Sequence, residues 1–203
     1  MTGQKDEIAK WVADLADADP SAREASALRL HSAGVALVSP ILNEWLKDPE
    51  LRELMRSLST DNQGKPNPAY TVGIAVEPHH FERIRAANGS PRLSEVPPDQ
   101  DAKEFELRFA DSCHFDILTT RQPGGAGAIA RFLQKLGEGI QQIEVNVTDV
   151  DRATDILRTR FGVAPIYSAT RPGADGTRVN FFLVSVAEGK KCLVELVEPS
   201  GGT

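Results

Sequence analysis

The stretches VGIAV (72–76) and CHFDIL (113–118) decide the fold, because the chain contains a second version of each. VGIAV matches IEVNV (143–147) at an offset of 71 residues, and CHFDIL matches CLVELV (192–197) at an offset of 79. A longer helix and a longer hairpin in the second copy explain the difference, because insertions are tolerated at both places. Residues 71–199 are therefore predicted to contain two copies of one structural module.

Hydrophobic periodicity predicts a similar order of elements in both modules. The first module, 71–121, begins with a strand and a short helix, and its further strands are expected at 104–110 and 113–120. The second module, 139–199, begins with a strand at 141–147 and a helix at 149–162, and its further strands are expected at 165–169, 178–186 and 191–199. A helix that carries Ile129, Phe132, Leu133 and Leu136 joins the modules. We expect an α+β fold in which paired βαβββ modules form a cupped mixed sheet.

Residues 1–62 are predicted to form a small all-α domain of four short helices. Apolar residues recur at helical spacing, and three dipeptides place a capping residue before a proline at the first helical position: Asp19-Pro20, Ser39-Pro40 and Asp48-Pro49. The run at 17–54 resembles a HEAT-type helical repeat in its Asp-Pro opening and its glycine turn. Residues 63–70 have the Asn, Gly and Pro content of a linker, so the domain boundary is expected there.

Composition excludes several classes of protein. The net charge of −6, with both signs interspersed, provides no basic stripe for nucleic acid. Apolar runs such as FFLVSV are far shorter than the roughly 20 residues of a membrane span, and no apolar signal region opens the chain. Cys113 and Cys192 are too few for a disulfide framework. We therefore expect a cytoplasmic protein with reduced thiols that binds neither nucleic acid nor membrane.

Two carboxylates stand out because they lie within otherwise apolar strands. Asp116 and Glu195 occupy equivalent positions of the two modules. A buried carboxylate is costly unless it has a hydrogen-bonding or ionic partner, so its presence indicates either such a partner or a function. One interpretation is structural, with Arg108, Arg178 or backbone donors satisfying both acids. The other is functional, because a pseudo-twofold axis brings repeat-equivalent positions together. In that case Thr71, Asp116, Gln142 and Glu195 converge on one site.

The paired modules resemble the vicinal oxygen chelate superfamily, which includes glyoxalases, bleomycin-resistance proteins and extradiol dioxygenases, and within it the methylmalonyl-CoA epimerases. The resemblance rests on VGIAV, on the run at 125–153, and on RPGADGTRVNFF (171–182) followed by CLVELVEP (192–199). It implies a divalent metal held by one residue from each of four strands. Those positions correspond to four residues of this chain: Thr71, Asp116, Gln142 and Glu195.

The residues at these positions change what the resemblance implies. Threonine and glutamine stand where the family has histidines, and oxygen ligands alone suit a hard ion such as magnesium or calcium, or no ion. Glu144 adds a third carboxylate at a position where the family commonly has a small residue. There it either provides a ligand for a metal ion or fills the space that the ion would occupy. Without a metal, three neighbouring acids would repel one another and raise the pKa of at least one, which is a route to acid–base catalysis.

Three functions remain open. The first is a glyoxalase- or epimerase-like enzyme that performs acid–base isomerisation or lyase chemistry on a small carbonyl or thioester compound, with Glu195, Glu144 and Glu106 as its candidate acids and bases. The second is a binding protein that holds a small molecule of the antibiotic type. The third gives the helical domain the main role, as a surface for a protein partner. Dimers are common in the resembled family, so a homodimer is a further expectation.

Two other features carry less weight. Gly125, Gly127 and Ala130 fit a dinucleotide-binding fingerprint, but no series of βαβ units extends the pattern. His79 and His80 are predicted to lie exposed at a helix start, and His114 to be packed or hydrogen-bonded in its strand.

Overall fold

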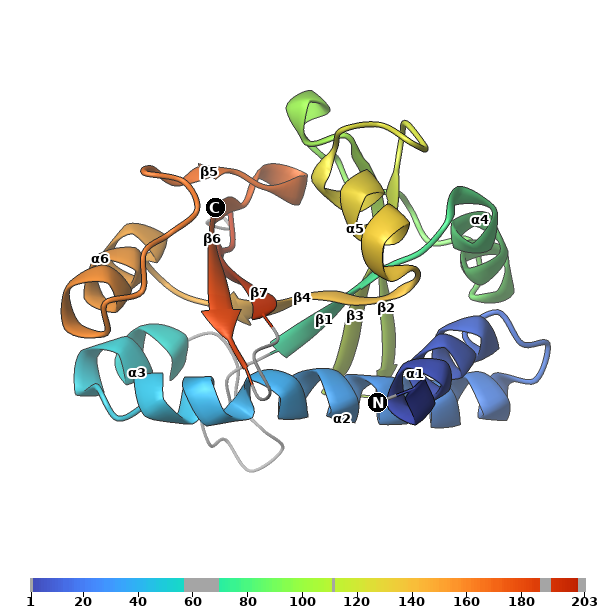
Figure 1. Ribbon diagram of the computed structural model, residues 1–203, viewed down its shortest axis with the longest axis horizontal. Coiled ribbons are helices and arrows are strands. Elements are labelled where there is room, and N and C mark those ends of the chain that lie inside the picture. The colour runs from blue at the N-terminus through green and yellow to red at the C-terminus, as the bar shows by residue number, and fades with distance from the viewer. Residues whose placement is uncertain (1, 57–69, 111, 187–190, 201–203) are drawn as a thin grey trace. The chain divides into compact units, whose positions relative to one another are not determined.

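The computed structural model describes residues 2–56, 70–110, 112–186 and 191–200 (Figure 1). The chain divides into two compact units. One combines Met1–Gly34 with Thr71–Gln141, and the other combines Val35–Tyr70 with Gln142–Thr203. Each unit thus pairs part of the helical segment with one of the two modules. The predicted domain boundary at residue 62 and almost all of the predicted linker lie outside the described residues.

The helical segment contains three helices among the described residues, α1 (Thr2–Asp14), α2 (Pro20–Trp45) and α3 (Pro49–Arg56). The predicted starts at Pro20 and Pro49 are confirmed, but the helix start predicted at Ser39-Pro40 is wrong, since α2 continues through Pro40. Val38, Leu42 and Trp45 continue its buried stripe across the proline. The free energy gained by packing these side chains exceeds the free energy lost with the backbone hydrogen bond that proline removes.

Among the described helices, α2 alone is long and apolar enough to cross a membrane by length and composition. The core helix of a soluble protein passes the same test. Leu30 and Val38 of α2 are fully buried within the protein, and Leu42 and Trp45 nearly so. One face of α2 is therefore packed within the protein.

The first unit carries a three-stranded sheet in the order β2-β3-β1. Its strands are β1 (Tyr70–Ala75), β2 (Ala102–Ala110) and β3 (Cys113–Thr120), with β1 parallel and β2 antiparallel to β3. Helix α4 (Pro78–Ala87) follows β1, η1 (Pro98–Gln100) precedes β2, and α5 (Ala128–Leu136) follows β3. The Phe81 ring of α4 packs edge-on against Phe105 with 4.7 Å between centroids, and both side chains are fully buried.

The second unit carries four strands in the order β4-β7-β6-β5. They are β4 (Gly139–Asn146), β5 (Arg171–Pro172), β6 (Arg178–Ser185) and β7 (Lys191–Glu198), with α6 (Val150–Arg160) after β4 and η2 (Ala174–Gly176) after β5. The strand predicted at 165–169 is wrong. That segment forms only an isolated bridge at Pro165, because proline offers no ladder donor, and the short strand lies at 171–172.

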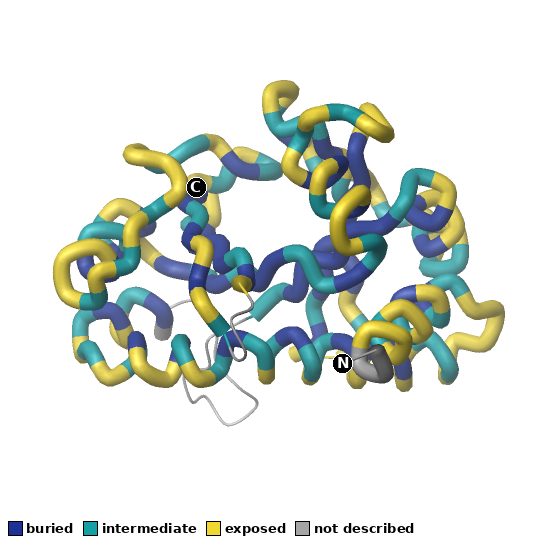
Figure 2. The backbone as a smooth tube through the Cα atoms, in the orientation of Figure 1, coloured by how far each residue is buried: buried dark blue, intermediate teal, exposed yellow. Residues whose placement is uncertain are grey.

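The pairing register confirms the internal repeat. In the first unit Thr71 lies opposite His114 and Gly73 opposite Asp116. In the second unit Gln142 lies opposite Leu193 and Glu144 opposite Glu195. These pairs are related by the offsets of 71 and 79 residues found in the sequence, so each position of one parallel pair has a counterpart in the other. The buried stretches of the strands appear dark blue in Figure 2.

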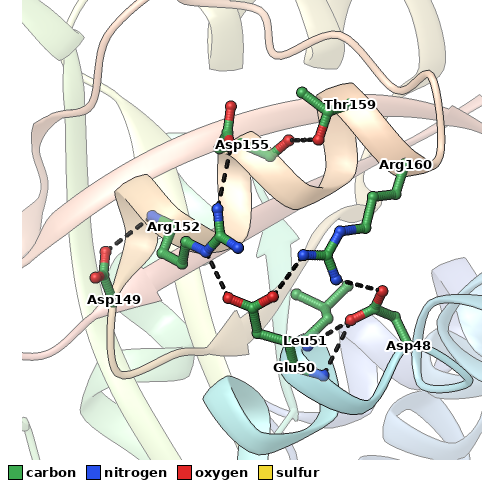
Figure 3. A network of polar contacts seen from close by, with 8 residues as sticks. All are labelled: Asp48, Glu50, Leu51, Asp149, Arg152, Asp155, Thr159 and Arg160. Atoms are coloured by element: carbon green, nitrogen blue, oxygen red, sulfur yellow. Dashed lines mark hydrogen bonds and ion pairs between the residues drawn. The ribbon is translucent and has the colours of Figure 1, made fainter.

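Within the second unit, α3 and α6 are joined by a network of ion pairs (Figure 3). Arg160 donates to Asp48 at 2.7 Å and to Glu50 at 2.5 Å, and Arg152 donates to Glu50 at 2.6 Å. Asp48 also caps α3 by accepting from the Glu50 and Leu51 backbone N–H groups, both at 3.0 Å. The Leu51 N–H and the Arg160 guanidinium lower the pKa of Asp48, and the two arginines lower the pKa of Glu50.

Replacing Arg160 with glutamine is expected to lower the melting temperature at neutral pH, and the difference from the wild type should shrink in acid. A lowered carboxyl pKa stabilises the fold above the ordinary values of 3.8 and 4.5, and that stability is lost as the pH falls through the lowered values. Thermal unfolding between pH 7 and pH 2 measures the difference. Arg158→Gln is the control, because Arg158 pairs with Asp155 of its own helix. A gap that stays constant with pH would contradict this account.

Candidate functional site

The second unit buries a cluster of two carboxylates around one amide. The Gln142 Nε2 atom donates to Glu195 Oε2 at 2.5 Å and to Glu144 Oε1 at 3.2 Å. Gln142 and Glu195 are each 7% exposed, and Glu144 is half-buried. One amide therefore links both carboxylates, and we call Gln142, Glu144 and Glu195 the carboxylate cluster.

Strand geometry places these three side chains together. Gln142 and Glu144 are two residues apart on β4, so they share a face, and Glu195 lies directly opposite Glu144 on β7. The intervening Ile143 and Val145 are fully buried on the other face. The face that the sequence assigned to the core is thus confirmed, and the polar face carries the cluster. A buried carboxylate is costly without a partner, and the hydrogen bond from the Gln142 amide offsets part of the cost of burying Glu195.

The carboxylate cluster continues into apolar side chains on the same face of the sheet. Phe181 of β6 lies opposite Glu195, and Leu183 lies opposite Leu193. Phe181 and Leu193 are half-buried and Leu183 is 49% exposed. The neighbouring Tyr167 packs edge-on against Phe181 at 6.0 Å between ring centroids. Acidic groups beside an exposed apolar surface can act on a substrate whose reacting part is uncharged.

The first unit places its predicted residues differently. Asp116 is 4% exposed, and its strand neighbours on the same face are Gly73 of β1 and Glu106 of β2. Thr71 lies two pairs further along, opposite His114. Glu106 is exposed and forms an ion pair with Arg108 at 3.0 Å, so its carboxylate is held at the surface. Within this unit Glu106 and Asp116 share a face. That the four positions of the two modules converge stays a prediction.

Arg178, proposed from the sequence as a partner for the buried acids, forms its ion pairs elsewhere. It pairs with Glu198 at 3.0 Å and with Asp151, and the hydrogen bond from Arg178 lowers the pKa of Asp151. The donor to the acids is instead Gln142, which the family resemblance implies only as a metal ligand. The sequence contains a signal for this role, because Gln142 lies two residues from Glu144 in a strand and its amide therefore shares a face with that acid.

The carboxylate cluster does not fit a metal centre in this arrangement. Its oxygen donors match a hard ion, but Gln142 directs its N–H groups, and not its oxygen, toward both carboxylates. Within the described ranges, no group of three or more His, Cys, Asp and Glu side chains is arranged to hold an ion.

One histidine of α4 corrects the sequence prediction. His80 was expected to be exposed, but it is 6% exposed, and its Nδ1 lies 2.9 Å from the Glu138 carboxylate. Burial opposes ionisation of Glu138, but hydrogen bonds from His80 and from the Glu77 N–H outweigh it and lower the pKa of Glu138. His79 is exposed, as expected. The pair attaches α4 to the segment that enters β4, which is a structural role.

The two cysteines are buried free thiols, as the sequence predicted. Burial raises the pKa of Cys192 to about 12, and burial together with the charge of Glu24 raises that of Cys113 to about 11. Thiolate is the reactive form, so neither residue is a nucleophile near neutral pH.

Comparison with known proteins finds similarity among solved structures. Methylmalonyl-CoA epimerase from Mycobacterium tuberculosis is 33% identical over 64% of this chain and 86% of its own length, with a TM-score of 0.52. A methylmalonyl-CoA epimerase in complex with methylmalonyl-CoA and NH4+ is 28% identical, over 63% of this chain and 90% of its own, also with a TM-score of 0.52. A variant of the Streptomyces coelicolor enzyme in complex with 2-nitronate-propionyl-CoA gives the same values. No family model and no curated protein matches the chain.

Proposed function

The chain belongs to the vicinal oxygen chelate superfamily and has the fold of the methylmalonyl-CoA epimerases, and from this we propose that it is an acid–base isomerase acting on a small acyl thioester. The observation that supports the proposal is the buried Gln142 amide that holds Glu195 and Glu144 side by side. Carboxylates positioned in this way transfer protons to and from carbon.

In the proposed reaction Glu195 acts as the base. Its carboxylate takes the proton from the carbon next to the thioester carbonyl, so the C–H bond breaks, an O–H bond forms on Glu195, and the electron pair moves onto the carbonyl as an enolate. Delivery of a proton from solvent to the opposite face of that carbon re-forms the C–H bond with inverted configuration and completes the isomerisation. Gln142 keeps Glu195 in a fixed orientation, and Glu144, directly opposite on the neighbouring strand, exchanges protons with it and with solvent.

Exchange of the α-proton with deuterium tests this function. The protein is incubated in D2O with methylmalonyl-CoA, propionyl-CoA and the corresponding N-acetylcysteamine thioesters, and the α-proton signal is followed by NMR. We expect catalysed loss of that signal for at least one thioester. Binding of a thioester that keeps its α-proton would contradict the enzyme and support the alternative of a binding protein.

The predicted metal ion is tested separately, because the proposed reaction routes no step through it. Exchange is measured after dialysis against EDTA and again with added magnesium or calcium. Equal rates would support acid–base catalysis by the carboxylate cluster alone. A rate that appears only with the ion would contradict this description of the site.

A further inference from the structure

A further polar side chain lies beside the carboxylate cluster, on the same face of the second unit. Asn146 is two residues from Glu144 on β4, so strand alternation places its side chain on the face that carries Gln142. Asn146 is half-buried, and its neighbour across the strand pair is Val197 of β7, which is 8% exposed. An amide therefore borders the carboxylate cluster, with an apolar side chain next to it.

The Asn146 amide has no protein partner. In the part of the chain that the structure describes, its side chain forms no hydrogen bond. Gln142 differs, because the two N–H groups of its amide point to carboxylates, one to Glu195 at 2.5 Å and one to Glu144 at 3.2 Å. Of these two amides of β4, Asn146 is thus the one whose donors remain available to a ligand.

The proposed reaction needs such a donor. Removal of the α-proton places negative charge on the thioester oxygen, and stabilising charge that develops during a reaction is usually the largest single contribution to catalysis. The acids of the carboxylate cluster repel an anion, and Gln142 directs its N–H groups to those acids. A neutral amide on the same face can provide the hydrogen bond that the enolate oxygen requires.

The spacing of the strands fits a thioester placed between Glu195 and Asn146. Glu195 lies opposite Glu144, so Asn146 is diagonal to it, and strand spacing and rise place the Cα atoms of Glu195 and Asn146 roughly 8 Å apart. Within a thioester, the α-carbon and the carbonyl oxygen are about 2.4 Å apart, and each polar contact adds about 3 Å. One thioester can therefore meet the base at its α-proton and the amide at its oxygen.

We propose that Asn146 is a further catalytic residue, whose side-chain N–H donates a hydrogen bond to the carbonyl oxygen of the thioester and stabilises the enolate. This inference rests on the proposed function. The amide keeps its proton throughout, and the negative charge on oxygen disappears when the carbon is protonated again. Asn146 thereby takes the part that the family resemblance assigns to a divalent metal.

Replacing Asn146 with alanine is expected to lower kcat for α-proton exchange by about 10²–10³-fold, the usual effect of removing one donor to a developing negative charge. KM should change little, because the hydrogen bond strengthens as the enolate forms. Exchange is followed by NMR in D2O over a range of thioester concentrations. The probe is whichever of the thioesters tested for the proposed function the wild type exchanges fastest.

Replacing Asn146 with aspartate distinguishes a hydrogen-bond donor from a residue that only fills space. Aspartate has the size of asparagine but carries a charged oxygen in place of the N–H donors, so Asn146→Asp should exchange more slowly than Asn146→Ala. If Asn146 only filled space, alanine would be the more damaging substitution. Thr159→Ala is the control, because Thr159 is an exposed residue of the same unit that bonds within α6, to the Asp155 carbonyl. Its rate should equal that of the wild type, and melting temperatures show that each variant is folded.

The possible outcomes separate this role from the proposed function. Absence of exchange by the wild type with every thioester would contradict the proposed function and, with it, the role of Asn146. Wild-type exchange that is undiminished in a folded Asn146→Ala protein would overturn the role of Asn146 alone. The same conclusion would follow if Asn146→Asp were faster than Asn146→Ala, or if the loss appeared only as a higher KM, which indicates binding of the unreacted thioester.

Discussion

Replacing Glu195 with glutamine is expected to slow α-proton exchange by about 10²–10⁴-fold, the usual contribution of a positioned acid or base. The amide has the shape of the carboxylate but cannot accept a proton from carbon. Glu144→Gln should cost less, because Glu144 only exchanges protons with Glu195. Initial rates of deuterium incorporation, measured with saturating thioester, separate the two variants.

Glu82→Gln provides the control, because Glu82 is an exposed carboxylate of α4 whose ion-pair partner Lys103 lies 4.0 Å away. Its exchange rate should equal that of the wild type. Melting temperatures show whether each variant is folded. Undiminished exchange in a folded Glu195→Gln protein would refute the assignment of the base.

Replacing Phe182 with alanine is expected to lower the free energy of unfolding by about 3–5 kcal/mol, the usual cost of removing a buried aromatic side chain. Phe182 is fully buried, and its ring packs edge-on against Trp45 of α2 with 6.5 Å between centroids. The substitution removes this contact and leaves a cavity. Denaturant unfolding monitored by circular dichroism measures the change.

Leu183→Ala is the matched control, since Leu183 is the next residue of β6 but points to the other face and is 49% exposed. Its effect should be about 0.5 kcal/mol, as for surface substitutions in general. Equal destabilisation by the two substitutions would contradict the assignment of strand faces. Trp45 belongs to the helical segment, so its ring contact with Phe182 joins that segment to the core of the second unit.

The repeat could be predicted from the sequence because the residue pattern of each short strand can be compared directly between the two copies. The offsets of VGIAV and CHFDIL predicted which positions of the two modules are equivalent, and the pairs Gly73–Asp116 and Glu144–Glu195 of the structure agree with them. The sequence predicts two helices where the structure has α2, because a proline is a strong local stop signal, whereas packing of the buried stripe past Pro40 is a tertiary effect.

The sequence predicted the residues of the candidate site but not the contacts between their side chains. Periodicity identified Gln142, Glu144 and Glu195, since alternation assigns strand faces. It did not show that Gln142 donates to both acids, because rotamers and amide orientation depend on packing. Phe181 was not predicted as part of the site because its place opposite Glu195 depends on how β6 pairs with β7, and periodicity alone does not show which strands pair.

The shared register of the two parallel pairs makes the first unit an internal reference for the second. At the position where the second unit has Glu144 opposite Glu195, the first unit has Gly73 opposite Asp116. The two units therefore present a buried carboxylate with and without an acidic neighbour on the adjacent strand. Exchanging glycine and glutamate between the two positions would show what Glu144 contributes to the chemistry of Glu195.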